Sequence, residues 1–126
     1  MQLLLLATLG GGIGAGARYL IQTEMIRRLG PGFPWWTLAI NVAGCLLMGI
    51  IADLISRRFG GSPEARALLM TGVLGGFTTF SAFSLDVAQL VERRDMLAAA
   101  GYIGGSVILT IAALYLGIAI ARTVVP

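Results

Sequence analysis

The sequence predicts an all-α membrane protein with four transmembrane helices in one domain, residues 1–126, and three observations predict it. Of its 126 residues, 57% are hydrophobic and only 12% are charged. An ordinary soluble domain is about 25% charged, so this chain has too few polar side chains to cover a globule in water. Four apolar windows follow one another, each close to the ~20 residues that span a bilayer as a helix. Short segments rich in charge, glycine or proline separate the windows.

The spans are predicted over residues 2–25, 35–56, 66–92 and 97–122. The first lacks the positively charged leading region of a signal peptide, so we expect it to be retained as a helix. The second follows Pro31, Gly32 and Pro34, which favour a turn. Trp35 and Trp36 open it, at a position where amphipathic rings favour the membrane interface.

The third span contains the unusual run from Gly75 to Ser84. Paired glycines and β-branched threonines are poor helix formers, so we predict an interruption near Gly75 to Thr79, close to the bilayer centre. Irregular backbone at this depth persists only inside protein or beside a water-filled cavity, and it frees backbone groups to meet ions. The alternative is a kinked helix whose own hydroxyl groups satisfy its backbone.

Small residues at four-residue spacing are expected to let the helix backbones pack closely in lipid. The predicted pairs are Gly10 with Gly14, Gly12 with Gly16, Gly72 with Gly76, and Gly101 with Gly105.

The basic residues exclude nucleic acid as a partner. All nine are arginines, scattered in ones and twos, whereas a nucleic-acid site needs a clustered basic face. There is no histidine and there are six acidic residues, so a metal site built from His, Cys or carboxylate ligands is not expected. Cys45, the only cysteine, is expected to be a small buried residue. No nucleophile–base pair suggests an enzyme, and we expect no organic cofactor.

The arginines are balanced between the two sides of the membrane. One side would carry Arg57, Arg58, Arg66 and Arg122, and the other Arg27, Arg28, Arg93 and Arg94, with Arg18 nearer the second side. The positive-inside rule then gives almost no preferred orientation. We therefore predict a dual-topology protein that forms an antiparallel homodimer, the alternative being that other features set one orientation.

Polar side chains inside the spans are costly in lipid and are the candidate functional residues. They are Thr37 and Asn41 in the second span, Thr79, Ser81 and Ser84 in the third, and Tyr102, Ser106 and Thr110, spaced by four, in the fourth. Each could simply make interhelical hydrogen bonds. Phe80 and Phe83 could pack in the core, or their positive ring edges could approach an anion. Together these groups could replace the hydration shell of a small, hard anion.

The sequence resembles the Fluc (CrcB) family of bacterial fluoride channels along essentially its whole length. The resemblance lies in Gly14 to Tyr19, in Pro34, Thr37, Asn41 and Gly44 at their spacing, and in the run Gly75 to Ser84. It implies a multi-pass protein of the bacterial inner membrane that passively exports fluoride and excludes chloride. It also implies antiparallel homodimers with two pores and a structural Na⁺ at the dimer centre.

The resemblance assigns roles by position. Asn41, Phe80 and Phe83 match the fluoride pore, with Thr79 and Ser81 in the same element, and Thr37 and Arg18 in the vestibules. Tyr102, Ser106 and Thr110 match a polar track, and the backbone carbonyls of Gly75 and Thr78 match the Na⁺ ligands. The chain departs from the family pattern at Leu114 and at Asp86.

Two other functions stay open at this stage. A small four-span drug exporter needs a membrane-embedded carboxylate, and Glu24 lies at the wrong end of its helix. A membrane scaffold without transport would explain the small-residue packing but not the interrupted third span.

Overall fold

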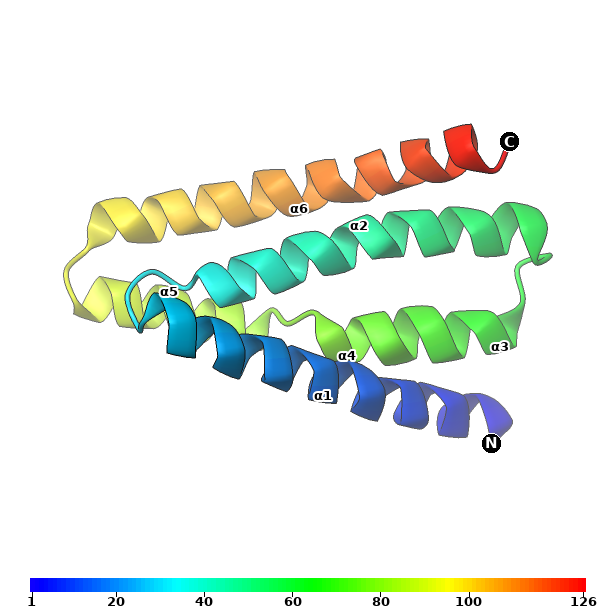
Figure 1. Ribbon diagram of the computed structural model, residues 1–126, viewed down its shortest axis with the longest axis horizontal. Coiled ribbons are helices and arrows are strands. Elements are labelled where there is room, and N and C mark those ends of the chain that lie inside the picture. Colours follow the sequence, from blue (N-terminus) through cyan, green and yellow to red (C-terminus); the bar gives the residue numbers. More distant parts are fainter.

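Four helical segments alternate in direction along the bundle in the computed structural model, which describes all residues 1–126 (Figure 1). The single helices are α1 (Gln2–Leu29), α2 (Trp35–Arg58) and α6 (Met96–Val124). The third segment is composite and consists of α3 (Pro63–Ala65), η1 (Arg66–Leu74), α4 (Gly75–Phe77) and α5 (Ser81–Glu92). All four segments are long and apolar enough to cross a membrane. The all-α, four-helix membrane fold predicted from the sequence is thereby confirmed.

Each helical segment extends one to four residues beyond the span predicted for it at one end or at both. The 29 residues of α6 measure roughly 43 Å at about 1.5 Å per residue, against a hydrocarbon core of ~30 Å. Both termini and the α2–α3 connection lie at one end of the bundle, and the α1–α2 and α5–α6 connections lie at the other (Figure 1).

The third segment is bent, and the irregular part is Thr78–Phe80 rather than the predicted Gly75 to Thr79. Gly75 and Gly76 are still helical in α4, whereas Thr78 adopts an extended conformation with φ −83° and ψ 157°. Gly76 lies against the backbone of Gly11 in α1, so tertiary contact keeps this glycine pair helical despite its low propensity. The preceding stretch η1 is a π-helix, a form that often occurs beside functional sites.

Glycine allows two close helix contacts. A Cβ atom on Gly10 or Gly14 of α1 would overlap backbone atoms of η1, and one on Gly72 or Gly76 would overlap or crowd the backbone of α1. These two predicted pairs are confirmed as packing positions.

The other two predicted glycine pairs do not pack within the subunit. A Cβ atom on Gly12, Gly16, Gly101 or Gly105 would meet nothing within 4 Å, because these glycines face away from the neighbouring helices. The sequence analysis missed a second contact, in which Gly49 of α2 meets α6 and Gly117 of α6 meets α2. The bundle therefore consists of two closely packed pairs, α1 with η1 and α4, and α2 with α6.

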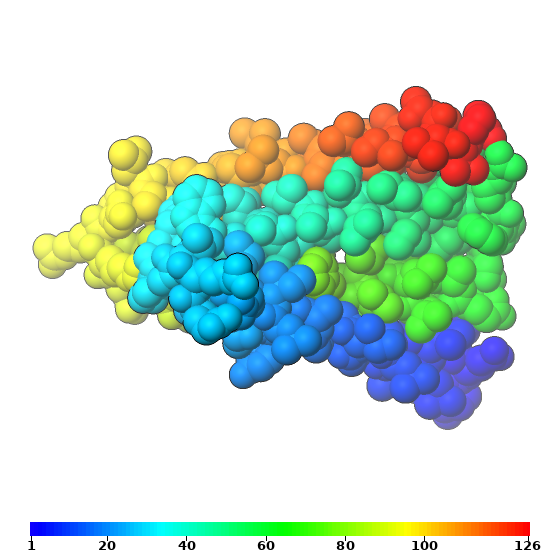
Figure 2. All heavy atoms as spheres, viewed as in Figure 1, coloured from blue at the N-terminus to red at the C-terminus, as the bar shows by residue number.

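Most apolar side chains face outward, as expected of a surface covered by lipid. Figure 2 shows α1 along one side of the molecule and α6 along the other, with α2 and the third segment between them. Trp35 is 52% exposed, as an interfacial residue should be, but Trp36 is turned inward. A small core of Phe83, Leu90, Ala99 and Tyr102 joins α5 to α6.

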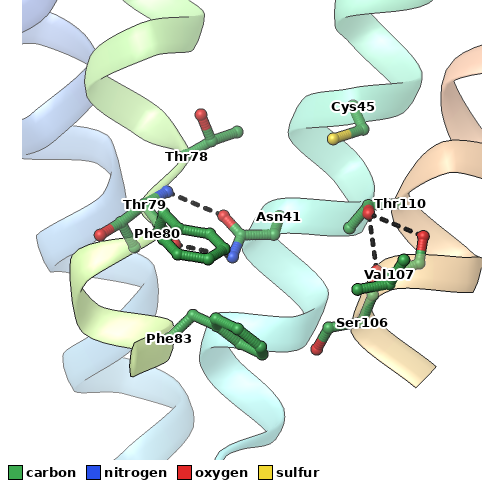
Figure 3. A pocket seen from close by; sticks show the side chains of 9 residues that line it. All are labelled: Asn41, Cys45, Thr78, Thr79, Phe80, Phe83, Ser106, Val107 and Thr110. Atoms are coloured by element: carbon green, nitrogen blue, oxygen red, sulfur yellow. Dashed lines mark hydrogen bonds between the residues drawn. The ribbon is translucent and has the colours of Figure 1, made fainter. Parts of the chain in front are cut away.

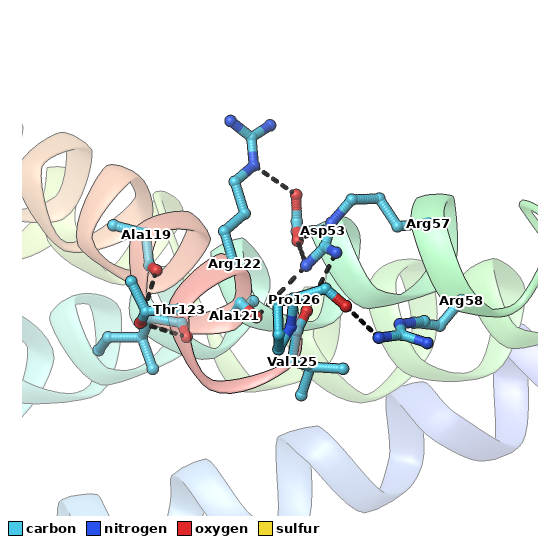
Figure 4. A network of polar contacts seen from close by, with 10 residues as sticks. Asp53, Arg57, Arg58, Ala119, Ala121, Arg122, Thr123, Val125 and Pro126 are labelled. Carbon is cyan, nitrogen blue, oxygen red and sulfur yellow. Dashed lines mark hydrogen bonds and ion pairs between the residues drawn. The ribbon is translucent and has the colours of Figure 1, made fainter.

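Asp53 ties the C-terminal ends of α2 and α6 together (Figure 4). The Nε–H groups of Arg57 and Arg122 donate to its two carboxylate oxygens, at 2.7 and 3.0 Å. Arg57 also donates to the backbone carbonyls of Ala121 and Val125. This carboxylate is buried and fully engaged by two guanidinium groups.

Candidate functional site

An open pocket of about 220 Å³ lies between α2, the break at Thr78–Phe80 and α6 (Figure 3). Its lining residues are Asn41, Cys45, Thr78, Thr79, Phe80, Phe83, Ser106, Val107 and Thr110. None of them is charged. The lining therefore combines amide, hydroxyl, thiol and aromatic groups beside the break in the third segment.

Asn41 holds the break in place from the facing helix. Its Nδ2–H donates to the Thr79 carbonyl at 3.0 Å, and its Oδ1 accepts from the Thr79 N–H at 2.8 Å. A single amide side chain thus satisfies both backbone groups of a residue that the helix has left unpaired. The second hydrogen on Nδ2 has no partner in the bundle, so it is free to meet a ligand.

The Thr79 side chain also bonds the first turn of α5, which begins at Ser81. Its Oγ1 accepts from the Ala82 N–H at 3.1 Å, as an N-cap does, and lies 3.2 Å from the Ser81 hydroxyl. The break is therefore held at both ends by side chains.

This arrangement leaves two backbone carbonyls free. In a continuous α-helix the Gly75 and Thr78 carbonyls would accept from Thr79 and Ala82. Those two N–H groups donate to the Asn41 and Thr79 side chains instead, and the two carbonyls accept no other hydrogen bond. Gly75 lies on the exposed surface of the subunit.

The two phenylalanines lie close together but differ in exposure. Their ring centroids are 5.3 Å apart, and Phe80 is 76% exposed whereas Phe83 is 8% exposed. Phe83 also packs on Tyr102 at 5.0 Å. Phe80 consequently presents its ring at the open side of the pocket, while Phe83 forms its inner wall.

Ser106 is the one buried side-chain donor without a partner. The residue is 7% exposed, and its hydroxyl oxygen has no hydrogen bond within the bundle. Figure 3 shows Ser106 and Phe83 on opposite sides of the pocket. An unsatisfied buried hydroxyl is costly, so this wall of the pocket is a place where a water molecule or a ligand can complete the hydrogen bonding of Ser106.

Thr110, one turn further along α6, uses its proton within the helix. Its hydroxyl donates to the Ser106 carbonyl at 2.6 Å. The predicted row of donors is thus unequal, because Ser106 is free to donate and Thr110 is not.

The structure brings six of the ten predicted anion-path residues together at this pocket: Asn41, Thr79, Phe80, Phe83, Ser106 and Thr110. Thr37, Ser81, Tyr102 and Arg18 lie outside it. The Tyr102 hydroxyl donates to Asp86 at 2.9 Å, and the Arg18 Nε–H donates to the Gly76 carbonyl at 3.1 Å. Thr37 is buried in α2.

Three lining residues were not predicted for the anion path: Cys45, Val107 and Thr78, the last of which was assigned to the Na⁺ site. Cys45 follows Asn41 by four residues, the spacing that puts two side chains on one helix face, so this signal was available. The thiol is half-buried on the wall rather than buried in the core. Nothing in the sequence distinguishes Val107 from the other apolar residues of its helix.

The profile of the family described as "CrcB-like protein, Camphor Resistance (CrcB)" matches residues 5–118. The chain belongs to the CrcB family. A relative from Rhizobium etli is 51% identical over 121 residues, which cover 96% of this chain and 97% of the relative. One from Chelativorans is 52% identical over 98% and 99% of the two chains, and one from Rhodospirillum centenum is 49% identical over 99% of each.

These three relatives carry the name "Fluoride-specific ion channel FluC". They are ion channels and not enzymes. The family assignment made from the sequence motifs is confirmed over nearly the whole chain.

Proposed function

We propose that this protein is a fluoride-selective channel that lets fluoride leave the cytoplasm passively through the bacterial inner membrane. The observation that carries the proposal is the free Ser106 hydroxyl in an uncharged pocket beside a helix break. The name of the relatives supports the choice of ion.

The pocket can replace water around a small anion without a fixed charge. Removing an ion from water costs on the order of tens of kcal/mol, so several donors must compensate. Ser106 offers its O–H and Asn41 its second N–H. Phe80 and Phe83 can turn their positive ring edges toward the ion. Because none of these groups binds as strongly as a fixed charge does, the ion can also leave.

A single subunit leaves the pocket open on the side of Phe80, which favours a complete path formed by two copies. The arginine balance between the two ends supports an antiparallel homodimer with dual topology and two pores. Side-chain contacts place Arg57, Arg58 and Arg122 beside the C terminus, and Arg93 beside the α1–α2 connection.

The residues near the break also fit a structural Na⁺. Free backbone carbonyls at an unwound helix are the groups that hold Na⁺ in transporters with broken helices. The Gly75 and Thr78 carbonyls meet this requirement, since both accept no hydrogen bond. Two copies of the chain would supply both pairs of carbonyls, and the ion would hold the subunits together.

The drug-exporter alternative lacks a carboxylate in the pocket, since Asp86 lies outside it and accepts a hydrogen bond from Tyr102. Glu24 is paired with Arg27 and Arg28, and Asp53 is paired with two other arginines at the end of the bundle. A scaffold role leaves the free hydroxyl of Ser106 unexplained.

The test is efflux from liposomes that contain the purified protein. A fluoride electrode should record rapid release of trapped fluoride when a potassium ionophore relieves the charge imbalance. Parallel vesicles loaded with chloride should retain their anion. Fluoride that stays in the vesicles, or chloride that leaves equally fast, would refute the proposal.

A further inference from the structure

We propose that Cys45 is a wall residue of the ion path, and that its thiol is a modification site at which a small disulfide-forming electrophile blocks passage. The inference rests on the proposed fluoride function and adds to it a residue and a class of inhibitor.

The sulfur of Cys45 lies at the pocket. Cys45 lies one helical turn beyond Asn41 and lines the same pocket. Figure 3 shows its sulfur directed from α2 into the space between α2 and the break. The thiol makes no hydrogen bond and is half-buried, so it is neither used by the fold nor sealed in the core.

Ser106 lies on the opposite wall of the pocket. The buried, unpartnered Ser106 hydroxyl lines this same pocket, which independently marks the space as one that a ligand enters. A group attached to Cys45 would therefore occupy volume that the ion needs.

The close contact between α2 and α6 limits where a group attached to Cys45 can lie. One turn beyond Cys45, Gly49 lies against the backbone of α6, and Gly117 lies against α2. No side chain fits between α2 and α6 at Gly49 and Gly117, so a group on the sulfur has no room between the helices in that direction. The space open to such a group is the pocket that Asn41 and Phe80 also line.

The reaction with methyl methanethiosulfonate, a small uncharged reagent, can be written in full. The Cys45 thiol loses its proton to solvent, and the thiolate attacks the sulfenyl sulfur. A Cys45–S–S–CH₃ disulfide forms, the S–S bond of the reagent breaks, and methanesulfinate leaves with the electron pair. Dithiothreitol reverses the change by thiol–disulfide exchange.

The experiment compares fluoride efflux before and after treatment for each protein. The wild-type protein should take up one methylthio group by intact mass, lose at least tenfold in efflux rate, and recover after dithiothreitol. Cys45→Ala should show the same rate with and without reagent, whatever that rate is. A matched control places the cysteine on the outer face of α2, as Leu47→Cys in the Cys45→Ala background, since Leu47 is exposed. This protein should be labelled without loss of efflux.

The outcomes separate the two proposals. If untreated wild-type protein releases no fluoride, the channel function itself is refuted. If it releases fluoride and continues to do so after complete labelling, only the place of Cys45 on the path is refuted. Failure of the reagent to label Cys45, or equal block of the Leu47→Cys protein, would also overturn the inference.

Discussion

At the scale of single residues, Asn41 and Ser106 differ in how their side chains are hydrogen-bonded within the bundle. Asn41 bonds both backbone groups of Thr79 across the bundle and retains one free N–H. The Ser106 hydroxyl makes no hydrogen bond. Asn41 therefore holds the break and lines the pocket, whereas the Ser106 hydroxyl has no structural partner to lose.

Asn41→Asp tests the double role. The carboxylate has no N–H to donate to the Thr79 carbonyl, and it places a negative charge on an anion path. We expect fluoride efflux to fall at least tenfold and the free energy of unfolding to drop by ~1–3 kcal/mol. Electrode recordings and thermal denaturation in detergent measure the two effects. Unchanged efflux would remove Asn41 from the ion path.

Ser106→Ala separates function from stability. Removing a buried hydroxyl that has no partner should leave the folded protein as stable as before, or stabilise it by up to ~1 kcal/mol. Efflux should nevertheless fall several-fold, because a donor to the ion is lost. Thr110→Val is the matched comparison and should cost less efflux, since the Thr110 proton is used within α6. Equal losses in the two variants would contradict the distinction.

At the scale of elements, backbone-to-backbone contact at glycine decides how the helices sit. α1 lies on η1 through Gly10 and Gly14, and α2 lies on α6 through Gly49 and Gly117. Spacing alone predicted the first contact and two others that do not form within the subunit. A small-residue pair shows only that close packing is possible, and the facing helix decides whether it occurs.

Gly14→Ala should disturb the α1–η1 contact, because the added Cβ would overlap the Val73 carbonyl. We expect a loss of ~1–3 kcal/mol in the free energy of unfolding, as for other overpacked sites. Gly101→Ala is the control. It meets open space and should gain up to ~1 kcal/mol from helix propensity. Thermal denaturation in detergent compares them, and an equal response of both variants would argue against the close contact.

At the scale of the whole molecule, the helix break shapes both the pocket and the backbone of the third segment. Side chains take the N–H groups of Thr79 and Ala82, and this frees the Gly75 and Thr78 carbonyls. The same break therefore contributes Thr78, Thr79 and Phe80 to the pocket and leaves two backbone carbonyls without a hydrogen bond.

Lowering Na⁺ should weaken the proposed dimer. If Na⁺ binds only the assembled form, the dimer loses stability according to RT ln(1 + [Na⁺]/Kd), about 2.7 kcal/mol between a hundredfold excess over Kd and none. Subunit exchange between differently labelled proteins should accelerate as N-methylglucamine replaces Na⁺ at constant ionic strength. An exchange rate that does not respond to Na⁺ would dismiss the Gly75 and Thr78 assignment.

Composition and periodicity were sufficient for the number of helices, their order and the disturbance of the third one. These features follow from local properties, namely the length of apolar windows, proline and glycine at turns, and the low helix propensity of the run from Gly75 to Ser84. The motif resemblance also identified the family and six residues that line the pocket.

Contacts between distant segments determined the position of the break and the residues that line the pocket. Gly11 of α1 keeps Gly76 helical and moves the break to Thr78–Phe80. Asn41, 38 residues earlier in the chain, bonds the backbone of that break. Whether Cys45, Ser106 and Thr110 face the pocket depends on how α2 and α6 pack against each other at Gly49 and Gly117. The sequence alone does not show which helix surfaces will be in contact, because the energy of a helix–helix contact depends on how two distant segments pack together.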